Sequence, residues 1–141
     1  MSSKPNQKFA MIGVGGYIAP RHLEAIKAVG GMLVCAYDIK DSVGILDRFF
    51  PQCQFFTDFE RFQTYIQDQC YGGEAIDYFT ICSPNYLHIN HIQFALSQGG
   101  DVICEKPLVL SKNDLVKLNE YEIRFNKKVY TVLQLREHPA I

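Results

Sequence analysis

The stretch FAMIGVGGYIAP (residues 9–20) indicates the fold of the chain. Apolar residues at its start predict a short buried strand, and the glycine-rich turn that follows opens an amphipathic helix over 20–28. In this strand-turn-helix setting Gly13 permits a tight turn, and Gly15 leaves no side chain between the backbone and a bound pyrophosphate. The N–H groups at the helix start would then face the phosphates. The stretch therefore predicts a dinucleotide site; the alternative is a purely structural glycine turn.

Two further positions bear on this predicted site. Ile18 stands where a third glycine is usual, so we expect Gly16 and Ala19 to provide the close approach of helix and sheet. Asp38 ends the second apolar run about 20 residues later, where a carboxylate accepts from both hydroxyls of a ribose and repels a 2′-phosphate. This favours NAD over NADP, although Lys40 is close enough to soften the preference. The alternative is an aspartate that caps a turn.

Apolar runs alternate with amphipathic stretches along the whole chain. Strands are predicted at 9–13, 32–37, 54–56, 75–82, 101–104 and 128–135. Helices are predicted between them, one after a capping box formed by Thr57 and Glu60 and another after Ser111. This order predicts an α/β fold with a doubly wound parallel sheet (Rossmann) in a single domain. Ligands of such sheets bind outside the carboxyl ends of the strands.

Composition excludes several classes of function. The 141 residues carry 14 Lys and Arg against 15 Asp and Glu, and no basic stripe favours nucleic-acid binding. No apolar run is long enough for a membrane span, and the start of the chain has no signal-peptide core. Five cysteines, with no C-x-x-C pair, indicate reduced thiols, a cytoplasmic protein and no metal site.

Polar residues follow the fourth and fifth predicted strands. Ser83 and Asn85 begin the loop beside the expected switch point, where they could contact ribose or phosphate or simply form a turn. Lys106 lies between Glu105 and Pro107 after the fifth strand, where an ammonium could reach a reacting hydroxyl above a nicotinamide ring. The alternative is a surface lysine in a turn.

The histidines do not predict a metal centre. His88 and His91 are three residues apart on a predicted helix, but no acidic or cysteine partner stands at an obvious spacing. We expect His88 to touch cofactor or substrate and His22 to be structural. The polar residues that alternate after the sixth strand are Gln134, Arg136 and His138. Arg136 could pair with a phosphate or carboxylate, or lie on a solvated strand end.

Five segments together carry a family resemblance: GVGGYIAPRH (13–22), YDIKD (37–41), SPNYLH (83–88), CEKPL (104–108) and LQLREHP (133–139). They resemble the amino-terminal domain of the Gfo/Idh/MocA oxidoreductases over essentially the whole chain. The first and last segments are most similar to the family's UDP-N-acetylglucosaminuronate 3-dehydrogenase branch. The resemblance implies NAD as cofactor and Lys106 as the catalytic residue. The cofactor-binding residues that it implies are Gly13, Gly15, Gly16, Tyr17, Ile18, Asp38, Ser83, Asn85, His88, Glu105, Lys106 and Gln134.

The resemblance also implies a reaction and a larger protein. Hydride would pass from C3 of a UDP-linked N-acetylamino-sugar uronate to NAD, in the synthesis of a surface polysaccharide. Family members carry a second domain with a catalytic histidine and most of the substrate pocket, and homo-oligomers are expected of the full-length enzyme. We therefore expect a disordered tail at 1–7, an NAD-binding domain at 8–135 and the start of a link at 136–141, inactive by itself.

Two other functions remain open from the sequence. The domain could be an NAD-binding sensor without turnover, which a short chain favours and the lysine after the fifth strand disfavours. It could also belong to a dehydrogenase of the same family that acts on a free sugar or an inositol. Each predicts a small-molecule partner, with neither nucleic acid nor membrane.

Overall fold

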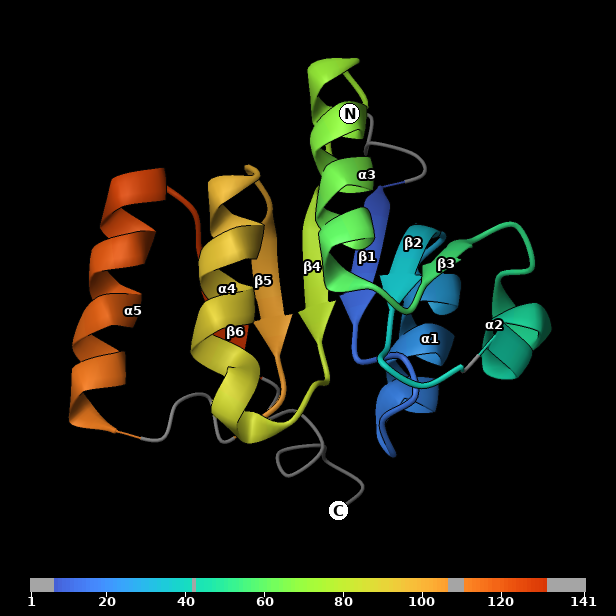
Figure 1. Ribbon diagram of the computed structural model, residues 1–141, viewed down its shortest axis with the longest axis horizontal. Helices are drawn as coiled ribbons and strands as arrows, with labels where there is room; N and C mark the ends of the chain where they lie inside the picture. The colour runs from blue at the N-terminus through green and yellow to red at the C-terminus, as the bar shows by residue number, and fades with distance from the viewer. Residues whose placement is uncertain (1–6, 42, 107–110, 132–141) are drawn as a thin grey trace.

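Six strands form one parallel sheet in the order β3-β2-β1-β4-β5-β6, with helices on both faces (Figure 1). This computed structural model describes residues 7–41, 43–106 and 111–131. The predicted α/β fold with a doubly wound parallel sheet is confirmed. The elements in chain order are β1 (Lys8–Ile12), α1 (Ala19–Ala28), β2 (Met32–Tyr37), α2 (Val43–Phe49), β3 (Gln54–Phe56), α3 (Phe59–Tyr71), β4 (Tyr78–Ile81), a 3₁₀ turn (Asn85–Leu87), α4 (His88–Ser97), β5 (Asp101–Cys104), α5 (Lys112–Phe125) and β6 (Val129–Thr131).

The order of the strands reverses between β1 and β4. Strand β1 pairs with β2 on one side and with β4 on the other, so successive strands are added outward in both directions. Because every pairing is parallel, the segments that follow the strands meet along one edge of the sheet, here named the carboxyl edge: residues 13–19, 38–41, 82–88 and 105–106. The crevice at the reversal is where doubly wound sheets bind ligands.

The side chains of β1 alternate between two cores. Ala10 and Ile12 pack with Phe62 of α3, on the face that α3, α4 and α5 cover. Met11 packs with Leu23 of α1, on the opposite face (Figure 1). Both faces of the central strand are thus buried, as its unbroken apolar sequence predicts. Each such side chain, when fully buried, contributes roughly 1.5–3 kcal/mol to stability.

Two elements differ from the sequence-based prediction. Helix α2 was not predicted: its one fully buried side chain is Leu46, and Gly44 lowers its helix propensity. Strand β4 begins at Tyr78 rather than at residue 75. Of the sixth predicted strand, 129–131 is observed, and 132–135 lies outside the described residues.

The domain limits stay a prediction. Of the expected tail, residues 1–6 lie outside the described residues, as does the whole of 136–141. Gln7 is joined to the sheet, because its carbonyl accepts a hydrogen bond of 2.8 Å from the Met32 N–H. Within the described part of the chain no helix combines the length and apolar character that crossing a membrane requires.

The capping box predicted at Thr57 is wrong. The cap of α3 is Asp58, which has extended backbone angles and accepts from the Glu60 N–H at 2.9 Å. The helix begins at Phe59, one residue later than predicted, because Asp58 keeps the extended backbone of a cap and its side chain bonds the first turn. At α5 the predicted cap is confirmed, since the Ser111 hydroxyl accepts from the Asp114 N–H.

The two candidate caps of α3 can be told apart by mutation. Asp58→Ala removes the acceptor of the first turn and should lower the free energy of unfolding by about 1 kcal/mol. Thr57→Ala, its neighbour outside the helix, should change it by less than about 0.5 kcal/mol. Urea titrations of both variants provide the measurement, and a larger loss at Thr57 would restore the capping box.

Candidate functional site

Two glycines let the turn after β1 close on the loop after β4. Gly13 has φ +93°, and a Cβ there would lie 2.5 Å from the Ser83 nitrogen. A Cβ on Gly16 would lie 2.9 Å from the Cys82 carbonyl oxygen. Gly16 therefore lets the turn approach the loop after β4 closely. Ile18 stands at the position where a third glycine is usual. The turn is held to β2 by a hydrogen bond of 2.7 Å from the Gly13 N–H to the Tyr37 carbonyl.

The turn that leads into α1 contains backbone donors without an acceptor among the described residues. No side chain caps the helix at Ile18, and its first turn contains no acidic residue. In the described part of the chain the N–H groups of Tyr17 and Ile18 have no acceptor. Unpaired N–H groups at the positive end of a helix dipole form an anion site. The Tyr17 side chain beside them is 99% exposed.

Asp38 is fixed beside this turn by two backbone donors. Its Oδ2 accepts from the Gly15 N–H at 2.8 Å and its Oδ1 from the Lys40 N–H at 2.9 Å. Each carboxylate oxygen has further lone-pair capacity, so the group can still accept from a ribose diol. One donor expected at the pyrophosphate, that of Gly15, is thus engaged with the carboxylate expected at the ribose.

A hollow of about 370 Å³ lies behind the turn, between α1 and α2. Its lining residues are Val14, Gly15, Gly16, Pro20, Asp41, Gly44 and Ile45. Gly44 and Ile45 come from α2, the helix that the sequence analysis missed. The only available sequence signal for this helix was the small Gly44 next to the apolar Ile45. That pair has no helical spacing, so it does not distinguish a helix from an ordinary loop.

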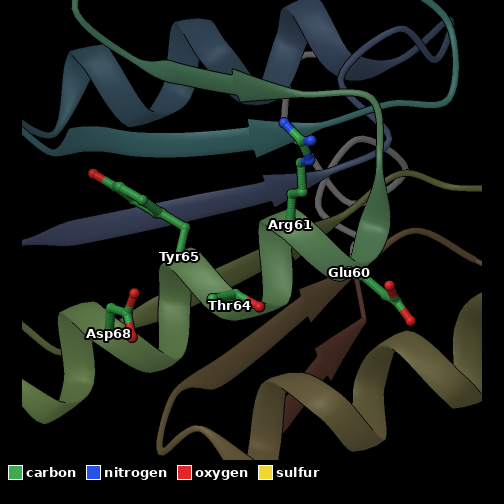
Figure 2. A pocket seen from close by; sticks show the side chains of 5 residues that line it. All are labelled: Glu60, Arg61, Thr64, Tyr65 and Asp68. Carbon is green, nitrogen blue, oxygen red and sulfur yellow. The ribbon is translucent and has the colours of Figure 1, made fainter.

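A second hollow of similar volume lies along α3, from its first turn toward its middle (Figure 2). It is lined by Glu60, Arg61, Thr64, Tyr65 and Asp68. The labelled side chains leave the helix in different directions and converge on no common point, with Glu60 pointing away from the others (Figure 2). This hollow therefore carries no chemistry comparable to that of the carboxyl edge.

Two buried histidines hold the loop after β4. The Ser83 hydroxyl shares a hydrogen bond of 2.8 Å with His91 Nδ1, and His88 Nε2 donates to the Ser83 carbonyl at 2.9 Å. Because Nε2 of His88 is the donor, Nδ1 is left to accept from the Cys104 thiol, 3.4 Å away. Burial, and then the charge of Glu105, raise the pKa of Cys104 to about 12, so the thiol keeps its proton.

The structure thus gives the histidines supporting positions. His88 is 1% exposed and Ser83 8%, whereas Asn85 is exposed at the start of the 3₁₀ turn. The contact of His88 with a cofactor stays a prediction. Among the described residues no group of three or more His, Cys, Asp or Glu side chains is placed to hold a metal ion.

The residues after β5 are hydrogen-bonded to β4 and to α1. The Glu105 N–H donates to the Ile81 carbonyl of β4 at 3.1 Å, and its carboxylate Oε2 lies 2.5 Å from His22 Nε2 of α1. Lys106 follows directly and is half-buried. Pro107 and the predicted residues Gln134, Arg136 and His138 lie outside the described residues. From the sequence we expected His22 to be structural, and its pairing with Glu105 was not predicted.

The fold therefore gathers most of the predicted site along the carboxyl edge. The glycine turn, Asp38, the Ser83 loop and the Glu105-Lys106 pair come from four different strands and meet around the reversal of strand order. Their individual roles toward a ligand stay predictions.

The chain is similar to several known proteins. The model of an oxidoreductase family with an NAD-binding Rossmann fold (GFO_IDH_MocA) matches residues 7–133. The WlbA (WbpB) dehydrogenase from Thermus thermophilus is 50% identical over 95% of this chain, with a TM-score of 0.91. Its structures are complexes with NAD and alpha-ketoglutarate and with NAD and UDP-GlcNAcA.

Two curated proteins are more distant. An uncharacterized oxidoreductase of Rhizobium meliloti is 26% identical over 132 residues, which are 94% of this chain and 38% of that protein. The 2,7-anhydro-N-acetylneuraminate hydratase of Mediterraneibacter gnavus is 27% identical over 106 residues, 75% of this chain and 26% of that protein. This chain also covers 43% of the Thermus protein, so it spans less than half of each relative.

The buried His91 ring makes a pH-dependent contribution to stability. Burial, and then the neighbouring His88, lower its pKa from 6.5 to about 4. The unfolded chain therefore takes up a proton that the folded chain refuses, and stability falls as pH decreases from about 6.5 to about 4, by up to about 3 kcal/mol. Above about pH 6.5 this contribution is fully present.

Urea unfolding at several pH values measures this effect. His91→Asn keeps a polar atom near the Nδ1 position but does not titrate, so its stability should fall less over the same window. Parallel curves for the variant and the wild type would show that His91 does not cause the pH dependence.

Proposed function

The chain belongs to the Gfo/Idh/MocA family of oxidoreductases, and we propose that it is the cofactor domain of an enzyme that oxidises C3 of a UDP-linked N-acetylamino-sugar uronate. The domain itself is an NAD-binding Rossmann domain. The observation that carries the finer proposal is the 50% identity to a dehydrogenase whose complex contains NAD and UDP-GlcNAcA. The position of Lys106 at the carboxyl edge agrees with it.

The residues of the carboxyl edge fit NAD. The unpaired N–H groups at the start of α1 suit a pyrophosphate, and the absent Cβ at Gly15 lets it approach. The fixed Asp38 carboxylate suits the adenosine ribose. The exposed Tyr17 ring stands beside the phosphate position and is available to cover a bound cofactor.

Oxidation of the sugar requires the hydroxyl at C3 to lose a proton as its carbon loses a hydride. NAD, when bound, accepts the hydride. We assign Lys106 to the proton: its amine lies at the end of β5, in the nicotinamide half of the site, where it would receive the hydroxyl proton or stabilise the developing alkoxide. General acid–base assistance of this kind contributes about 10²–10⁴-fold to rate.

The proposal extends to the longer protein. The substrate pocket and a second catalytic group would come from the rest of the enzyme, so we expect no sugar oxidation by these 141 residues alone. The Thermus complex with alpha-ketoglutarate supports a 2-oxo acid as the second substrate that takes the hydride back from the cofactor. A cytoplasmic homo-oligomer that serves surface-polysaccharide synthesis is the biological setting that we propose.

Cofactor choice tests the role of Asp38. The carboxylate should favour NAD over NADP, and Asp38→Ala should weaken NAD binding by roughly 1–3 kcal/mol, the effect of losing hydrogen bonds to a charged group. Calorimetric titration of the chain with both nucleotides gives the two affinities. Asp47→Ala, on the exposed side of α2, controls for the loss of one negative charge. NADP binding as tight as NAD binding would contradict the assignment.

Lys106 is tested in the full-length enzyme. Lys106→Met keeps the apolar stem and deletes the ammonium, so kcat for the UDP-sugar should fall by about 10²–10⁴-fold with NAD affinity nearly unchanged. Lys112→Met, an exposed lysine at the start of α5, is the matched control. Unchanged turnover in the Lys106 variant would make it a surface lysine, and a parallel loss of NAD binding would make it a cofactor-positioning residue.

A further inference from the structure

One hydrogen-bonded pair of side chains joins the two halves of the carboxyl edge. His22 Nε2 and Glu105 Oε2 lie 2.5 Å apart, although the residues are 83 positions apart in sequence. His22 is in the first turns of α1, next to the proposed phosphate site, and Glu105 directly follows β5. Strand β4 lies between β1 and β5 in the sheet, so the pair spans the crevice at the strand reversal.

Glu105 is held at two points. Its N–H donates to the Ile81 carbonyl, and its carboxylate is held by His22. The peptide that leads into Lys106 therefore starts from a fixed orientation, to which α1 contributes through His22. Removal of the His22 contact would free the carboxylate and loosen the start of that peptide.

Stability alone does not account for such a pair. The two side chains are 10% and 20% exposed, and a largely buried ion pair commonly contributes no more than apolar side chains of similar volume would. The Lys8–Glu74 ion pair, by contrast, is near the start of β1, at the opposite end of the sheet. The His22–Glu105 pair lies at the carboxyl edge, next to the proposed ligand site.

We propose that His22 is a positioning residue for the nicotinamide end of NAD. By holding Glu105 it fixes the end of β5, so that Glu105 and Lys106 present one constant surface to the nicotinamide ring while the start of α1 binds the pyrophosphate. This inference rests on the proposed NAD site and adds to it a residue on the phosphate-binding helix that acts on the other end of the cofactor.

The test compares two ligands that differ in the nicotinamide ring. NAD and ADP-ribose share the adenosine and the pyrophosphate, and ADP-ribose lacks the ring. His22→Leu should weaken NAD binding by about tenfold and leave ADP-ribose binding unchanged within about twofold. His22→Gln, whose amide can still donate to Glu105, should restore most of the NAD affinity.

Two further variants complete the experiment. The double variant His22→Leu/Glu105→Gln should bind NAD no more weakly than the weaker single variant, because both changes remove the same interaction. Glu74→Gln breaks the ion pair at the other end of the sheet and should affect neither ligand. Circular dichroism and thermal unfolding establish that each variant is folded; should His22→Leu not fold, His22→Gln, Glu105→Gln and their double variant provide the same cycle.

The outcomes separate this inference from the proposed function. An equal loss of affinity for NAD and for ADP-ribose in His22→Leu, or no loss of either affinity, would overturn the positioning role. His22 would then have a purely structural role. Absence of NAD binding by the wild-type chain would overturn the proposed site, and this inference with it. Selective loss of NAD with rescue by glutamine supports both.

Discussion

The contact between the turn after β1 and the loop after β4 is the constraint on which the rest of the carboxyl edge depends. Parallel pairing of these two strands brings their following residues together, and a side chain at Gly13 would collide with the Ser83 backbone. Glycine in the left-handed region relieves both the collision and the backbone strain at once. Because the two segments touch, the glycine turn after β1 and the loop after β4 form one continuous surface.

That surface is supported from below by buried hydrogen-bonding groups. His88 and His91 are buried, and the lowered pKa of His91 keeps its ring uncharged at neutral pH. The Cys104 thiol likewise keeps its proton. The carboxylates of Asp38 and Glu105 lie at the edge itself. Hydrogen bonds from buried polar groups fix the loop without placing unpaired charges in the core.

The chain contains the residues of the proposed cofactor site but few that would decide the substrate. The strands on both sides of the reversal are present, so the proposed pyrophosphate and ribose positions are built from this chain's own residues. The chain covers less than half of its similar proteins, and the sugar would contact residues outside it. Among the proposed catalytic groups, Lys106 is the one contributed by this domain.

The sequence by itself determined the features that are local in the chain: the strand-turn-helix at Gly13, the acidic end of β2 at Asp38, and the parallel α/β fold that the alternation of elements requires. Side-chain size, glycine and periodicity act over a few residues, so a pattern is enough to read them. Tertiary structure alone decided the rest. The choice of Asp58 over Thr57 as cap depends on which residue keeps extended backbone angles where α3 begins. The pairing of His22 with Glu105 depends on two distant segments meeting at one edge, because nothing in a linear pattern indicates which polar side chains the packing of a sheet brings within hydrogen-bonding distance.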